Sequence, residues 1–130
     1  MKFTLLLTAS PFTHQANETA FQFAKAALAK GHQINQVFFY QDAVYIGSRL
    51  NCTPSDESPL TERWQALAQQ YSFQLTLCIT ASSRRGVLNK EEAARNEKED
   101  TNIADGFQLV GLGQFFEACL HADRVMEFGA

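Results

Sequence analysis

Residues 74–86 read Gln-Leu-Thr-Leu-Cys-Ile-Thr-Ala-Ser-Ser-Arg-Arg-Gly, an apolar run that reaches Cys78 and is followed by Arg84, Arg85 and Gly86. Its apolar, β-favouring start predicts a buried strand, and the small polar residues after Cys78 predict a turn. In a parallel sheet, Cys78 would lie at the carboxyl end of this strand. Open α/β sheets bind ligands outside the carboxyl ends of their strands. The stretch therefore predicts a thiol at the edge of the sheet where functional sites form.

Strand and helix patterns alternate along the rest of the chain. Residues 2–8 are apolar and predict a central strand, and residues 14–30 show helical spacing that ends at Gly31. Ser58 and Pro59 predict the N-cap and the first turn of a helix that ends near Tyr71. The same patterns predict strands at 34–40, 73–79, 107–110 and 124–128, helices at 89–99 and from about 112 to 121, and a helical turn at 42–47.

This alternation predicts an α/β fold, a three-layer sandwich around a mostly parallel sheet of about five strands. The continuous apolar character of the first two strands is typical of a sheet covered on both faces. The arrangement is flavodoxin-like, and the chain of 130 residues is long enough for one domain, predicted to span residues 1–130.

The overall charge and hydropathy exclude several classes of function. The formal net charge is −3 and the pI is about 5.5, which argues against direct binding of nucleic acid through a basic surface. No apolar run is long enough to cross a bilayer. The apolar stretch at the N-terminus is too short for a signal peptide, so we expect a cytoplasmic protein with no membrane contact.

The three cysteines have no C-x-x-C spacing, and their odd number in a reducing compartment argues against a disulfide framework. Cys119 shares a helical face with Leu112, Phe115 and Phe116, so core packing is expected. Cys52 lies in a polar loop shortly before Asp56 and Glu57. These acids oppose thiolate formation, and Cys52 is interpreted as an incidental surface thiol.

Cys78 is the candidate catalytic residue. A nucleophilic cysteine needs access and help in forming thiolate, and Cys78 sits at the exit of a strand with Arg84 and Arg85 close in sequence. A buried free cysteine is also a common core residue. From position alone, a reactive thiol and a packed core thiol both remain open. The roles of the two arginines remain open too.

Metal and nucleotide sites are weakly indicated. His14, His32 and His121 form no metal-ligand spacing with the cysteines, although His14 would lie near the carboxyl edge of the first strand. The loop after that strand has no glycine, so it lacks a dinucleotide or phosphate-binding pattern. We predict no metal and no organic cofactor. A flavodoxin-like nucleotide-binding module stays an alternative on topology alone, and the polar residues 80–102 are a candidate mobile cover for the cysteine.

The chain resembles the DsrE-like sulfur-relay proteins over essentially its whole length. The resemblance rests on Cys78 with Arg84-Arg85-Gly86 and on six further stretches. These are Ala-Phe-Gln-Phe-Ala at 20–24, Gln-Val-Phe-Phe-Tyr at 36–40 with Ala-Val-Tyr at 43–45, Gly-Phe at 106–107, Gly-Leu-Gly at 111–113 and Ala-Asp-Arg-Val at 122–125.

This resemblance implies a sulfurtransferase in which Cys78 accepts sulfane sulfur as a persulfide and relays it to a partner protein. In such a relay the sulfur ends in the 2-thiolation of the wobble uridine of tRNA. The implied partners are sibling subunits resembling TusB and TusC in a dimer of heterotrimers, a donor resembling TusA and an acceptor resembling TusE. The alternative within this family is a non-catalytic subunit of a hetero-oligomer, in which Cys78 is merely packed.

Overall fold

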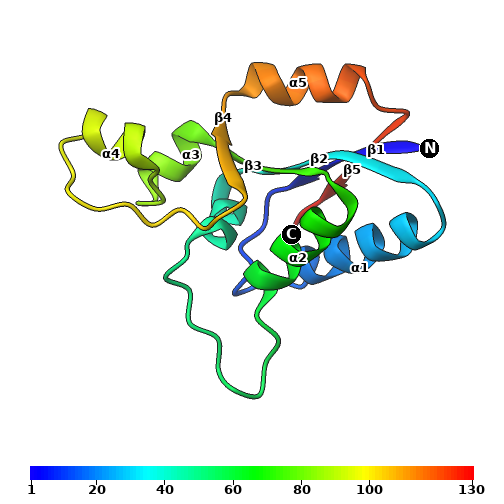
Figure 1. Cartoon of the computed structure of the whole chain (residues 1–130), viewed down its shortest axis with the longest axis horizontal. Coiled ribbons are helices and arrows are strands. Elements are labelled where there is room, and N and C mark those ends of the chain that lie inside the picture. The colour runs from blue at the N-terminus through cyan, green and yellow to red at the C-terminus, as the bar shows by residue number, and fades with distance from the viewer.

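The five strands form one all-parallel sheet in the order β4-β3-β2-β1-β5, in a computed structural model that describes residues 1–130 (Figure 1). Each pair of neighbouring strands runs parallel, which confirms the predicted α/β class and the number of strands. Right-handed crossovers through helices are the usual connection for such a sheet. The strands are β1 Lys2–Leu7, β2 Gln33–Phe39, β3 Gln74–Cys78, β4 Phe107–Val110 and β5 Arg124–Phe128.

Helices lie on both faces of the sheet, as Figure 1 shows. α1 (Ala16–Ala29) and α2 (Leu60–Tyr71) cover one face, and α5 (Leu112–Leu120) crosses the other. The 3-10 helix η1 (Gln41–Gly47) follows β2, α3 (Ile79–Arg84) follows β3, and α4 (Lys90–Arg95) comes next. None of these helices has the length and apolar character that crossing a membrane requires.

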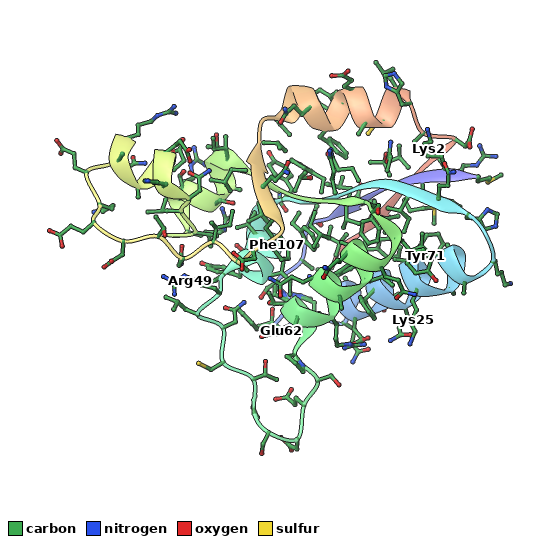
Figure 2. The ribbon with its side chains drawn as sticks, viewed as in Figure 1. Lys2, Lys25, Arg49, Glu62, Tyr71 and Phe107 are labelled. Carbon is green, nitrogen blue, oxygen red and sulfur yellow. The ribbon has the colours of Figure 1, made fainter.

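Aromatic side chains fill the two layers between the sheet and its helices. On the α1 and α2 side, the indole of Trp64 packs edge-on against Phe21 and Phe39, with ring centroids 5.1 Å and 5.7 Å away. On the α5 side, Phe38 stacks on Phe115 with centroids 4.6 Å apart. Adjacent residues of β2 therefore pack into opposite layers, because successive side chains of a strand point to opposite faces. Figure 2 shows how densely side chains occupy these layers.

The start of α2 differs from the prediction. Pro59, not Ser58, occupies the N-cap position, and the first helical residue is Leu60. The carbonyl of Pro59 accepts the amide hydrogen of Arg63 at 3.1 Å, and no side chain caps the helix. Proline has no amide hydrogen to satisfy and a fixed φ, so it suits this position. The predicted end of α1 is confirmed, since Gly31 follows the C-cap residue of this helix and has a φ of +88°.

The segment after Cys78 is more ordered than the sequence indicates. The predicted strand at 73–79 ends at Cys78, and the helix α3 begins at once. The helix predicted at 89–99 is shortened to α4, where Asn89 accepts a hydrogen bond from the amide of Glu92 at 2.9 Å. Residues 80–102 are tied to another part of the chain, because the Asn102 carbonyl accepts from the amide of Arg49 at 2.7 Å, and they are tied internally, because Glu92 accepts from the Ser83 hydroxyl at 3.0 Å. Movement of this segment over the cysteine stays a prediction.

The α5 face corrects one expectation about packing. Phe115 is buried, but Phe116 is 58% exposed and Leu112 is 41% exposed, so the predicted shared core face with Cys119 is only partly formed. A single helix of nine residues covers this side of a five-stranded sheet. The flank of α5 that points away from Phe115 therefore has no neighbouring element to pack against.

The ion pair between Glu18 and Arg63 joins α1 to α2, with two hydrogen bonds of 2.6 Å and 2.7 Å. These hydrogen bonds from Arg63 hold the pKa of Glu18 below its ordinary value. A carboxyl with a lowered folded-state pKa stabilises the fold above its unfolded-state pKa, and this stabilisation disappears as the pH falls through the folded-state pKa. We therefore expect Glu18→Gln to lose about 0.5–1 kcal/mol at pH 7, with the difference from the wild type vanishing in acid.

Urea denaturation of both proteins between about pH 7 and pH 3 measures this difference. Glu62→Gln is the matched control, because Glu62 is exposed on α2 and forms no ion pair (Figure 2 labels it). A Glu18→Gln effect that stays constant across this pH range would contradict the assigned role of the ion pair.

Candidate active site

A pocket of about 620 Å³ opens at the carboxyl edge of the sheet. Its lining comes from the segments that directly follow β1, β2, β3 and β4. This is the edge where ligands bind in open α/β sheets. The lining residues are Thr8, Tyr40, Gln41, Asp42, Cys78, Ile79, Thr80, Ala81, Arg84, Arg85, Gly111 and Leu112.

Cys78 is the only cysteine in this pocket. It is the last residue of β3, where it pairs with Val110 of β4, and it occupies the N-cap position of α3. Only 4% of Cys78 is exposed, and it belongs to the main hydrophobic cluster as well as to the pocket lining. Cys78 is therefore part of the packed core and also borders the pocket.

Arg85 holds α3 against the start of η1. Its Nε donates to Oδ1 of Asp42 at 2.7 Å, and its Nη1 donates to the carbonyl of Ala81 at 3.0 Å. Between β2 and Asp42 the chain turns through Gln41, which has a φ of +52°. A residue other than glycine in the left-handed region carries a backbone cost that surrounding contacts must offset. The Arg85–Asp42 ion pair is one such contact, because it anchors the residue that follows the turn.

Arg84 behaves differently from its neighbour. Its side chain lines the same pocket, is exposed, and takes part in no ion pair or side-chain hydrogen bond of the structure. The sequence left the roles of the two arginines open. Tertiary contacts distinguish the two residues: Arg85 is bound to Asp42 and has a structural role, whereas the side chain of Arg84 has no ion pair and lines the pocket.

The other two cysteines lie elsewhere. Cys52 is exposed in the long loop that projects from the body of the molecule between η1 and α2, and its Sγ donates to the carbonyl of Leu50 at 3.5 Å (Figure 1). Cys119 is half-buried on α5, and burial raises the pKa of its thiol above the ordinary value. Neither sulfur borders the pocket of Cys78.

The histidines are also outside the pocket. His14 contacts the hydroxyl of Thr13 at 2.9 Å, so it does not face Cys78 as its sequence position allowed. His32 lies 2.8 Å from the amino group of Met1, and Nδ1 of His121 lies 2.9 Å from the carbonyl of Glu117. No three His, Cys, Asp or Glu residues are grouped so as to hold a metal ion.

Several pocket residues were missed in the sequence. Thr8, Tyr40 and Leu112 line the pocket, and Asp42 anchors Arg85 beside it. Each lies within a few residues of the carboxyl end of a strand. Because parallel strands bring these ends to one edge, their shared position was the available signal.

Removing the Arg85 side chain is expected to loosen the wall of the pocket. Arg85→Ala breaks the ion pair to Asp42 and the bond to Ala81, so we expect a loss of about 1 kcal/mol in the free energy of unfolding. Urea denaturation measures the loss. Arg84→Ala is the matched control and should change the stability by less than about 0.5 kcal/mol, since Arg84 has no partner. Equal losses for the two variants would refute the division of roles.

Comparison with known proteins places the chain in a family. A model of the DsrE/DsrF-like family matches residues 1–128. The putative sulfurtransferase DsrE of Allochromatium vinosum is 47% identical over 99% of both chains. A sulfurtransferase TusD homolog of Vibrio vulnificus is 43% identical over 98% of both chains, and the sulfurtransferase TusD of Erwinia tasmaniensis is 42% identical over 98% of this chain and all of its own.

Solved structures support the same fold. The ychN protein from E. coli superimposes with a TM-score of 0.78 at 18% identity, covering 98% of this chain and 99% of its own. A protein of unknown function from Methanobacterium thermoautotrophicum gives a TM-score of 0.62 at 10% identity over 97% of both chains. At such identities the likeness concerns the fold alone. Together with the family match, it confirms the resemblance seen in the sequence: the chain belongs to the DsrE/DsrF-like family, in the group whose curated relatives are sulfurtransferases.

Proposed function

We propose that this protein is a sulfur-relay sulfurtransferase that carries sulfane sulfur on Cys78 as a persulfide. The observation that carries the proposal is the position of Cys78 in the lining of the pocket on the carboxyl edge of the sheet. The names of the curated relatives support the reaction class.

The transfer consists of two thiol-exchange steps. The Cys78 thiolate attacks the outer sulfur of a donor persulfide, R–S–SH, so that a new S–S bond forms as the donor's S–S bond breaks. The electron pair of the broken bond leaves on the donor as R–S⁻, and Cys78 becomes Cys78–S–SH. A thiolate of the acceptor then attacks this outer sulfur, and Cys78 leaves as thiolate. Because each step exchanges one S–S bond for another, no external oxidant or reductant is consumed.

The surroundings of Cys78 suit a sulfur carrier that reacts with a bound partner better than a thiol that is freely exposed to solvent. Cys78 as a residue is almost fully buried, and the pocket of about 620 Å³ is of the size that admits a small group. Arg84, which has no ion pair, adds positive charge to the lining of the pocket, whereas the charge of Arg85 is balanced by Asp42. Attack is thereby restricted to sulfur that is presented through the pocket mouth.

The relay involves protein partners. We propose sibling subunits resembling TusB and TusC in a dimer of heterotrimers, a donor resembling TusA and an acceptor resembling TusE, with tRNA wobble-uridine thiolation in the cytoplasm as the end of the path. The exposed apolar side chains of α5, Leu112, Phe116 and Leu120, support membership of a complex, because contiguous apolar patches mark interaction sites. The net charge of −3 suits a protein that passes sulfur to other proteins and leaves tRNA to them.

The mass of the Cys78 peptide tests the proposal. After incubation with a persulfide donor, this peptide is expected to gain the mass of one sulfur atom, which a reductant then removes. The peptides of Cys52 and Cys119 serve as controls in the same sample, because neither residue borders the pocket. If Cys78 gains no sulfur and resists mild alkylation, the chain is instead a non-catalytic subunit with a packed thiol.

A further inference from the structure

A second pocket, of about 380 Å³, lies between α5 and the strands β2, β3 and β4, and we call it the amide pocket. It shares no lining residue with the pocket of Cys78. Its lining combines five amide side chains with one carboxylate and one imidazole, and it contains no lysine or arginine. The lining residues are Asn35, Gln36, Gln74, Gln108, Val110, Gln114, Glu117, Ala118 and His121.

Gln36 is the buried glutamine of this lining, with 6% of the residue exposed. Its Nε2 donates to Oε1 of Gln74, the paired residue of β3, at 3.5 Å, which is longer than the usual distance of about 2.7–3.2 Å. Its Oε1 is buried and accepts no hydrogen bond from the protein. A buried acceptor without a partner costs free energy, because it has lost water and gained no other donor. The fold therefore keeps an acceptor at this pocket that none of its own groups uses.

The glutamines of the neighbouring strands leave this acceptor within reach of a ligand. Gln74 and Gln108 are exposed, and apart from the long contact with Gln36 neither side chain forms a hydrogen bond. Exposed side chains change rotamer readily. They can therefore turn aside for an incoming group or bind to it.

The wall that α5 contributes is fixed in place. The carbonyl of Ala118 accepts hydrogen bonds from Nδ2 of Asn35 at 3.0 Å and from the hydroxyl of Thr4 at 3.1 Å, and these bonds hold α5 on the sheet. Glu117 and His121, on the same helix, are thereby held beside the strands that carry the glutamines. The pocket is thus formed before any ligand binds.

The charge of the amide pocket is negative. Glu117 is exposed and forms no ion pair. Nδ1 of His121 lies 2.9 Å from the carbonyl of Glu117, which can only accept, so Nδ1 carries a hydrogen and Nε2 of the neutral ring is an acceptor. Together with the unused oxygen of Gln36, these groups are complementary to a cation that donates several hydrogen bonds.

We propose that the amide pocket binds the guanidinium of an arginine side chain that a partner protein presents. A guanidinium has five N–H donors in a rigid plane and one positive charge, so a single group can donate to Gln36 and pair with Glu117. The ammonium of lysine is more strongly hydrated and is less suited to an interface. None of these residues takes part in the proposed reaction of Cys78, so the site is separate from sulfur transfer.

The exposure of the rim favours an arginine that belongs to a protein over a free small molecule. Sites for small molecules bury most of the ligand surface. Here a free guanidine would remain partly in water, whereas a partner protein covers the rim as it inserts its side chain. The exposed rim residues are Gln74, Gln108, Gln114, Glu117 and His121.

α5 also offers such a partner an apolar surface next to the pocket. Leu112, Phe116 and Leu120 are exposed and recur every four residues, on a different flank of α5 from Glu117 and His121. Protein interfaces combine an apolar centre with a polar rim, and arginine is enriched in them. A protein packed over α5 would therefore bury this apolar flank and place its arginine in the amide pocket.

Binding of a capped arginine tests the site without requiring the partner. The probe is N-acetylarginine N-methylamide, which models an arginine within a chain, and its matched control is the citrulline compound, which has the same shape and no charge. In the ¹⁵N-labelled protein, the side-chain amide signal of Gln36 is followed by NMR during each titration. We expect a saturable shift with the arginine compound and about tenfold weaker binding of the citrulline compound. Equal affinities, or no saturable shift of Gln36, would overturn the proposal.

Two variants test the residues assigned to the site. Glu117→Gln should weaken binding of the arginine compound about tenfold and remove its advantage over the citrulline compound. Gln36→Met should weaken binding, followed by the backbone amide of Glu117, and raise the urea midpoint, because it removes the unpaired buried acceptor. A lower midpoint with unchanged binding would show that Gln36 serves only the fold and would overturn its role.

Controls separate this site from net charge and from the reaction of Cys78. Glu62→Gln removes an exposed carboxylate from α2, outside the amide pocket, and should leave arginine binding intact. Glu117→Gln should load sulfur on Cys78 at the wild-type rate, so failure of the site leaves the proposed function untouched. Free arginine should bind no more tightly than the capped compound. Tenfold tighter binding of free arginine would identify a small-molecule site and would overturn the assignment of a partner protein.

Discussion

A Cys78→Ser variant is expected to lose sulfur uptake completely. Serine cannot form a persulfide, and no second cysteine borders the pocket. The loss should amount to about three orders of magnitude or more, as for removal of a catalytic nucleophile in other enzymes. Sulfur bound to the protein after incubation with a persulfide donor, measured by mass, is the readout.

The Cys78→Ser variant must be shown to fold correctly. Cys78 is 4% exposed within the hydrophobic cluster, so a serine hydroxyl there costs about 1–2 kcal/mol in the free energy of unfolding. Cys78→Ala avoids the polar group and should be equally inactive, with circular dichroism like that of the wild type. An alanine variant that folds and still takes up sulfur would place the reactive thiol elsewhere.

Cys52→Ser and Cys119→Ser are the matched controls, and both should retain full uptake. Cys52 is exposed on the projecting loop, and burial raises the pKa of the Cys119 thiol. A thiol with a raised pKa has less thiolate at neutral pH and reacts more slowly. Loss of uptake in either variant would contradict the assignment of Cys78 as the sole carrier.

Trp64→Ala is expected to cause the largest loss of stability, about 3–5 kcal/mol. Trp64 is completely buried on α2, packs edge-on against Phe21 and Phe39, and donates a hydrogen bond of 2.7 Å from Nε1 to Oδ1 of Asn17. Its removal leaves a cavity in the layer between α1, α2 and the sheet. It also leaves the buried side chain of Asn17 with no partner at all, because its amide nitrogen already has none.

Urea denaturation measures this loss of stability. Two further variants show how much of it comes from the hydrogen bond and how much a change at an exposed position of the same helix costs. Trp64→Phe keeps most of the ring and removes the hydrogen bond, so it should cost about 1–2 kcal/mol. Gln69→Ala, at an exposed position of the same helix, should change the stability by less than about 0.5 kcal/mol. A Trp64→Ala loss below about 1 kcal/mol would show that this layer collapses around the missing ring.

The sequence predicted the strands well because short stretches rich in apolar and β-favouring residues are bounded by polar or glycine-containing turns. The strands at 107–110 and 124–128 were predicted at the observed residues, and Gly31 was recognised as the glycine that ends the first helix, directly after the C-cap residue of α1. The helix α3 was missed, since Ile79–Arg84 mixes small polar residues with few apolar ones and shows no amphipathic period. The exposure of Leu112 and Phe116 was missed for another reason: periodicity marks an apolar face but does not say what covers it.

The sequence by itself determined that Cys78 ends a strand of a parallel α/β sheet and that Arg84 and Arg85 follow it. Those conclusions depend on local order, which hydrophobic period and turn residues specify. Only the tertiary structure decided which residues share the pocket with Cys78, because the carboxyl ends of four strands bring distant segments together. It also decided that Arg85 is bound to Asp42 whereas Arg84 is free. Asp42 lies 43 positions before Arg85, and no local pattern in the chain specifies a contact across that separation.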